Sequence, residues 1–101
     1  MFIVRTVFVK PAGIKWYKPA EGVTETLAQF GAAQFAAGAY LKARNRKVGK
    51  NKVVSTMVFA DQAAYDAWRT ACDAHPESVA KNAYFEASGI TKVVKKYQLV
   101  E

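Results

Sequence analysis

Two segments of the chain, residues 2–9 and 52–59, are apolar at both alternating sets of positions. In the first segment, Phe2, Val4 and Phe8 alternate with Ile3, Val7 and Val9. A strand of an antiparallel sheet with one face in water normally alternates apolar and polar residues. Both segments are therefore expected to be central strands of a sheet that is covered on both faces.

Two further segments predict the outer strands of this sheet. Residues 39–46 alternate between polar and apolar, and residues 91–100 are rich in Val with interleaved Lys. Turn residues at 48–51 join residues 39–46 to residues 52–59 as a β-hairpin. Residues 14–18 fit either a short return strand or an ordered loop.

Helix signals lie between these strands. Thr24 is expected to be the N-cap of a first helix that ends near Gly38. Asp61 is expected to cap a second helix, which Pro76 interrupts before a short third helix over residues 77–87. The expected buried side of the third helix consists of Val79, Ala80, Ala83, Tyr84 and Ala87.

The order of these elements is that of a ferredoxin-like βαββαβ fold, a single α+β domain over residues 1–101. Right-handed crossovers place both helical segments on one face of a four-stranded antiparallel sheet. No further element is left to cover the second face. A second copy of the chain, packed sheet to sheet in a two-fold dimer, is the expected cover.

Several classes of site are excluded by composition. The chain has one cysteine, Cys72, and one histidine, His75, so neither an internal disulfide nor a cysteine-based or multi-histidine metal site is expected. We expect no cofactor, and whether the protein is an enzyme stays open. No apolar run approaches the ~20 residues that cross a bilayer, and no signal-peptide pattern opens the chain. These features predict a cytoplasmic protein without a membrane partner.

Positive charge is concentrated in the expected hairpin. The chain has 15 Lys and Arg against 8 Asp and Glu, a net charge of +7. Residues 42–52 contain no acid and six bases: Lys42, Arg44, Arg46, Lys47, Lys50 and Lys52. This hairpin is either a solvated surface whose lysines block strand addition or a contact for nucleic acid or an acidic protein. An RNA-recognition motif is disfavoured, because residues 51–59 lack its glycine and aromatic pattern.

Residues 53–68 carry a family resemblance. There a strand, VVSTMVF, runs into a helix with an acidic cap and aromatic residues in its first turns, and His75 follows near the helix end. This arrangement resembles the dimeric α+β barrel superfamily, in particular its antibiotic biosynthesis monooxygenase-like domains, and the element order matches over the whole chain. The resemblance implies a homodimer, a ligand pocket between the sheet and the helices, and monooxygenase-like activity in some members.

We therefore expect a small homodimeric protein that binds a small ligand or partner. The candidate ligand-binding residues are Arg5, Trp16, Tyr40 and Trp68, with His75 as the candidate catalytic residue. Arg5 would pair with an anionic group, the aromatic rings would stack on the ligand, and His75 would handle a proton. Three of these residues have a structural alternative. His75 is expected to cap the end of the second helix, Trp68 to pack in the core, and Trp16 to fold back over it.

Overall fold

The two doubly apolar segments form the central strands of the sheet. The protein is described by a computed structural model that covers residues 1–100. In it, β1 (Phe2–Val9) and β3 (Lys52–Phe59) pair with each other. The edge strands are β2 (Lys42–Lys47) next to β3 and β4 (Thr91–Gln98) next to β1. All pairs are antiparallel, and the strand order is β2-β3-β1-β4.

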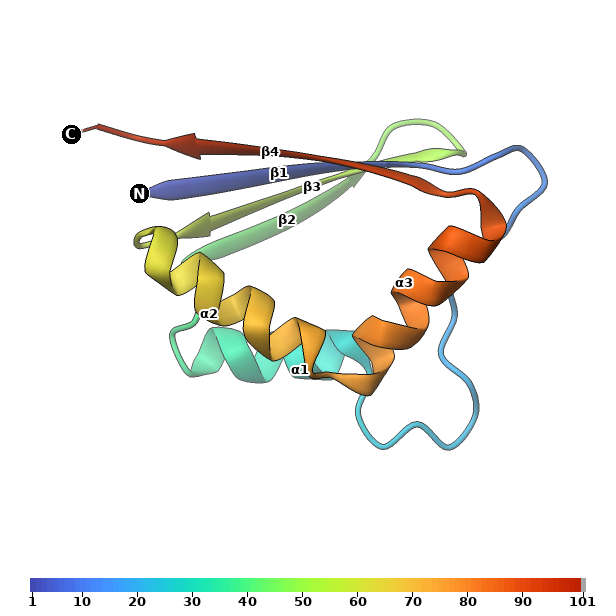
Figure 1. Ribbon diagram of the computed structural model, residues 1–101, viewed down its shortest axis with the longest axis horizontal. Helices are drawn as coiled ribbons and strands as arrows, with labels where there is room; N and C mark the ends of the chain where they lie inside the picture. The colour runs from blue at the N-terminus through green and yellow to red at the C-terminus, as the bar shows by residue number, and fades with distance from the viewer. Residues whose placement is uncertain (101) are drawn as a thin grey trace.

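All three helices lie on one face of this sheet (Figure 1). They are α1 (Leu27–Ala36), α2 (Gln62–Asp73) and α3 (Pro76–Ser88). The ferredoxin-like βαββαβ order is thereby confirmed, with the second helical segment divided before Pro76 as expected. None of the helices in residues 1–100 is long and apolar enough to span a membrane.

The first helix begins two residues later than predicted. Its N-cap is Thr26, whose hydroxyl accepts a hydrogen bond from the Gln29 amide N–H at 3.2 Å. The Gln29 side chain accepts the Thr26 N–H in return at 2.8 Å, which completes a capping box. Thr24 was the wrong cap because the residue three positions after it, Leu27, has no side-chain acceptor with which to return the bond.

The bounds of two strands, β2 and β4, also differ from the prediction. β2 begins at Lys42 rather than residue 39, because Tyr40 turns inward and its hydroxyl donates to the Gly31 carbonyl at 2.8 Å. Tyr40 therefore does not share a face with the basic residues of β2. Residues 14–18 are a loop, and β4 ends at Gln98 instead of residue 100.

The buried side of α3 was predicted wrongly. Val79 is 55% exposed, whereas Glu77, expected at the surface, is 7% exposed. His75 is the N-cap and Pro76 the first helical residue. Another stripe at helical spacing turns toward the sheet: Ser78, Lys81, Asn82 and Phe85. Three of these four residues are polar because they face a cavity rather than a close-packed core.

An aromatic cluster joins the sheet to α2. Phe59 is fully buried, and its ring centroid lies 5.4 Å from that of Tyr65. Phe2, the residue paired with Phe59 in the sheet, lies 5.5 Å from the same tyrosine ring. These three side chains fix the start of α2 against the end of β3.

Replacing Phe59 by alanine is expected to lower the free energy of unfolding by about 3–5 kcal/mol, because it leaves a cavity in the packed end of the domain. Urea denaturation measures the loss. Phe35→Ala is the matched control, since Phe35 is 52% exposed and should cost much less. Equal losses in the two variants would contradict the assignment of the core to this cluster.

Candidate functional site

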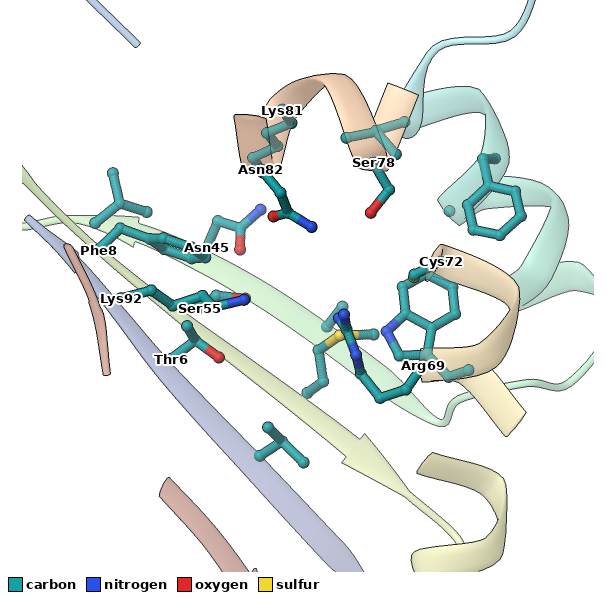
Figure 2. A pocket seen from close by; sticks show the side chains of 18 of the residues that line it. Thr6, Phe8, Asn45, Ser55, Arg69, Cys72, Ser78, Lys81, Asn82 and Lys92 are labelled. Carbon is teal, nitrogen blue, oxygen red and sulfur yellow. The ribbon is translucent and has the colours of Figure 1, made fainter. Parts of the chain in front are cut away.

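A cavity of about 760 Å³ lies between the helix-facing side of the sheet and the helical layer (Figure 2). We call it the interlayer cavity. All four strands, all three helices and the loop at Trp16 and Tyr17 contribute to its lining. Its volume falls within the ~300–1,000 Å³ that small-molecule sites occupy.

Small polar side chains form the middle of the cavity floor. Sheet register places Asn45 opposite Ser55 and Ser55 opposite Thr6, so the three lie in one row across β2, β3 and β1. Figure 2 shows them on the cavity side. Within residues 1–100, none of these three side chains makes a hydrogen bond to another protein group. Their hydroxyl and amide groups are available to a ligand.

Aromatic side chains line the cavity on the helical side. Trp68 stacks on Phe30 with ring centroids 5.6 Å apart, and Tyr40 meets Trp68 edge-on at 5.3 Å. Trp16 lies at the same cavity, with its ring 6.4 Å from that of Phe85. Of the predicted ligand-binding residues, the structure thus brings Trp16, Tyr40 and Trp68 to one cavity.

Three cationic side chains also line the cavity: Arg69, Lys81 and Lys92. No Asp or Glu is among the lining residues within residues 1–100. Burial lowers the pKa of Lys81, and the nearby ammonium of Lys92 lowers it further. Sequence reasoning missed all three because charged residues were assigned to solvent. The available signal was the helical spacing that places Lys81 on one face with Phe85.

Arg5, the cation predicted for the site, lies elsewhere. Neighbouring residues of a strand point to opposite faces, and Val4 and Thr6 line the cavity. Arg5 therefore lies on the opposite, open face of the sheet, paired in register with Lys95. Tyr97, which pairs in register with Ile3, shares that face.

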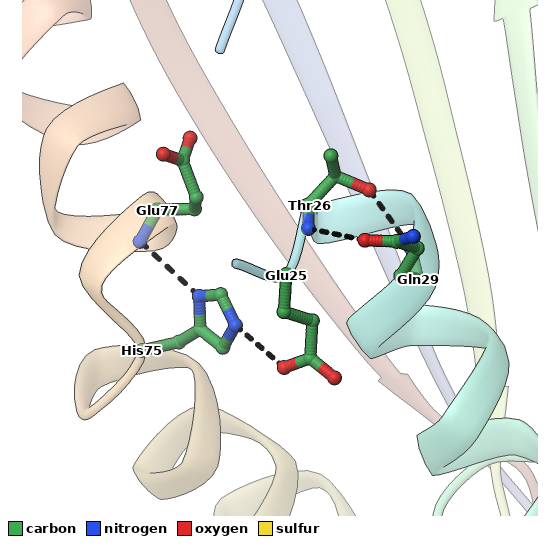
Figure 3. A network of polar contacts seen from close by, with 5 residues as sticks. All are labelled: Glu25, Thr26, Gln29, His75 and Glu77. Atoms are coloured by element: carbon green, nitrogen blue, oxygen red, sulfur yellow. Dashed lines mark hydrogen bonds and ion pairs between the residues drawn. The ribbon is translucent and has the colours of Figure 1, made fainter. Parts of the chain in front are cut away.

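His75 lies outside the cavity lining, at the N-terminus of α3 (Figure 3). Its Nδ1 accepts the Glu77 amide N–H at 3.1 Å, so the neutral ring carries its proton on Nε2. Nε2 then donates to the Glu25 carboxylate at 2.9 Å. The expected role as a cap at the end of the second helix is wrong, because the imidazole caps the next helix instead. Both ring nitrogens are occupied, which leaves no free nitrogen for a substrate.

The loop that carries Trp16 and Tyr17 folds back over α3, and Trp16 also lines the interlayer cavity. The Tyr17 hydroxyl donates to the buried Glu77 carboxylate at 2.5 Å, and this hydrogen bond raises the pKa of Tyr17. The Tyr84 hydroxyl donates to the Lys15 carbonyl, also at 2.5 Å. These two bonds hold the loop against the helix and position Trp16 at the cavity.

Cys72 is a buried thiol at the cavity wall. Burial raises its pKa, so the thiolate required of a nucleophile is disfavoured. His75 is only three residues away, but its nitrogens bond to Glu77 and Glu25. Within residues 1–100, no group of His, Cys, Asp and Glu side chains is arranged to hold a metal ion.

The basic hairpin is exposed along its whole length. All of Lys42, Arg44, Arg46, Lys47, Lys50 and Lys52 are exposed. The ion pairs within residues 1–100 are Arg69–Asp73 and His75–Glu25, so none involves the hairpin. Its cations are open to solvent and to a partner.

Comparison of the chain with protein-family models, curated proteins and solved structures found no match. The features of the protein that bear on its function are the interlayer cavity, the basic hairpin and the open face of the sheet.

Replacing His75 by alanine is expected to lower the free energy of unfolding by about 1 kcal/mol, the typical effect of losing an N-cap acceptor. His75→Asn should recover most of that loss, because Asn accepts the same backbone N–H but cannot act as a base in place of imidazole. Urea denaturation of both variants provides the measurement. If Asn were as destabilising as Ala, capping would not be the role of this side chain.

Proposed function

We propose that the protein binds a small, largely apolar organic molecule in the interlayer cavity. The observation that carries this proposal is the cavity itself, which combines an aromatic wall with a row of polar side chains that have no partner within residues 1–100. Ligand sites commonly have this composition, since apolar surface supplies affinity and a few polar groups fix orientation.

The size of the cavity favours a ligand over an incidental packing gap. Protein interiors are packed to about the density of organic crystals, and gaps larger than a water molecule are few. Here the space lies at the position where a ferredoxin-like domain packs its helices on its sheet. Small side chains, such as Ser55 and Ala43, keep it open on the sheet side.

The role proposed here is binding. Monooxygenase-like chemistry on the bound molecule is what the resemblance to the dimeric α+β barrel superfamily implies. The residue expected to handle a proton in such chemistry, His75, lies outside the cavity lining. We therefore include Trp16, Tyr40 and Trp68 in the proposed site and omit His75 and Arg5.

A homodimer is the second part of the proposal. On the open face, Val7 pairs in register with Val54 and Val93, and Ile3 pairs with Val58 and Tyr97. Of these, Val93 is 54% exposed. Val54 is only 7% exposed, so the exposed apolar surface of this face lies on β4, at Val93 and Tyr97. Apolar surface exposed on a sheet favours a covering partner, and a second copy of the same face would supply one.

The basic hairpin supports a different candidate function, contact with nucleic acid or an acidic protein. The supporting observation is its six exposed cations without an ion-pair partner within residues 1–100. Binding through phosphates weakens steeply between low and moderate salt, whereas binding of an uncharged molecule in the interlayer cavity is nearly independent of salt. A salt titration therefore separates the two functions.

Ala43→Trp is expected to abolish most binding of an uncharged fluorescent probe, N-phenyl-1-naphthylamine, because the indole would fill the cavity beside Met57. Probe fluorescence in a titration measures the affinity. Ala67→Trp on α2 is the matched control, since Ala67 is exposed and outside the cavity lining. Absence of probe binding to the parent protein, or equal binding by both variants, would contradict the proposed site.

Light scattering is expected to give a mass of about twice the 11.1 kDa of the chain. Val93→Lys should shift the protein toward monomer, because it places a charge in the apolar row of the open face. The control is Val79→Lys on α3, whose parent side chain is 55% exposed and lies outside the cavity lining. A monomeric parent protein would rule out the sheet-to-sheet dimer.

A further inference from the structure

The charges that line the interlayer cavity all have the same sign. Lys81 extends from α3 and Lys92 from β4, while Arg69 extends from α2. Figure 2 shows the three around one space, together with the amide of Asn82. A cavity that carries cations and lacks carboxylates provides a favourable potential for an anion.

Lys81 and Lys92 interact electrostatically, and neither has a counter-ion among the residues that the structure describes. Phe8 pairs in register with Lys92, and the Lys81 ammonium lies 5.5 Å from the centroid of the same Phe8 ring. The Phe85 ring lies 5.3 Å from that ammonium on α3 itself. Within residues 1–100, no carboxylate lies within ion-pair distance of either lysine. The positive charges of Lys81 and Lys92 repel each other, and an anion between them would relieve that repulsion.

The effect of this arrangement is visible in the pKa of Lys81. Burial and the Lys92 charge both lower it. Arg69 differs, because its guanidinium already pairs with Asp73 at 2.8 Å. The two lysines are thus the uncompensated charges of the cavity, and Arg69 contributes a partly neutralised third.

We propose that Lys81 and Lys92 form an anion subsite of the interlayer cavity, so that its ligand is an organic acid with an aromatic or apolar body. This inference rests on the proposed function, because it assigns the chemical class of the molecule that the cavity binds. The carboxylate, sulfonate or phosphate of the ligand lies near Lys81 and Lys92. Its apolar body extends toward the wall at Trp68 and Phe30.

The lining of the cavity favours a ligand that has both an anionic group and an apolar body. The hydroxyls of Thr6 and Ser55 lie in the register row between Phe8 and Val4 on the floor. They can supply neutral hydrogen bonds between the two lysines and the wall at Trp68 and Phe30. A neutral apolar molecule would leave the lysines uncompensated, whereas a small inorganic anion would leave the aromatic wall unfilled.

Two fluorescent probes with the same ring skeleton test the anion subsite. 1-Anilinonaphthalene-8-sulfonate carries a sulfonate, and N-phenyl-1-naphthylamine is its uncharged counterpart. Both are titrated into the parent protein and into the double variant Lys81→Gln/Lys92→Gln. The control is Lys52→Gln/Lys95→Gln, which removes the same charge from the open face. Circular dichroism establishes that each variant is folded.

The expected result is that Lys81→Gln/Lys92→Gln weakens sulfonate binding about tenfold or more. Binding of the uncharged probe should stay within about twofold in the same variant, and the control should leave both affinities near the parent values. A sulfonate affinity that falls equally in the control would overturn the subsite, since net charge would then explain it.

The remaining outcomes separate this inference from the proposed function. If both probes bind the parent equally and the cavity variant changes neither affinity, the anion subsite is wrong while the cavity remains a binding site. If neither probe binds the parent protein, the proposed function fails and the subsite fails with it.

Discussion

The packing of Phe2 and Phe59 against Tyr65 determines where the two layers of this protein touch. At that end of the domain the sheet and α2 are in close contact, with Phe59 fully buried. Away from it the floor side chains become small, at Ser55 and Thr6, and a cavity open to solvent separates the layers. The packed cluster therefore borders the cavity, and Tyr65 belongs to both.

Strand identity was predictable from the sequence, and helix orientation only in part. The doubly apolar segments identified the central strands because backbone pairing and burial on both faces select β-branched and aromatic residues. The inward-facing side of α2 was also predictable, since Tyr65, Trp68 and Cys72 are apolar and follow helical spacing. These assignments depend on local pattern alone.

The orientation of α3 required the tertiary structure. Its cavity-facing residues occur at the same spacing as those of α2, but Ser78, Lys81 and Asn82 are polar. A rule that assigns apolar residues to the interior selects Val79 and its neighbours instead. The rule fails where a helix faces a polar cavity, and this is also why the cationic part of the candidate site was missed.

Hydrogen bonds between side chains of distant segments likewise could not be predicted from local sequence patterns. His75 caps α3 and reaches Glu25, fifty residues earlier, while Glu77 receives the hydroxyl of Tyr17. Together these bonds tie the loops before α1 to the start of α3. The single histidine therefore supports the frame of the cavity, although its place at a helix end was foreseeable from Pro76.

The open face of the sheet imposes its own constraint on the proposed dimer. A cationic row lies between the two apolar rows. Its register partners across β4, β1, β3 and β2 are Lys95, Arg5, Thr56 and Arg44. A two-fold axis through this row would place each cationic side chain close to the same side chain of the second copy. The repulsion between them would destabilise the dimer, and burial in the interface would strengthen it. In a sheet-to-sheet dimer the axis must therefore pass near an apolar row, such as that of Val7, and the cations must reach the rim. The same sheet would then meet a second copy on one face and an anionic ligand on the other.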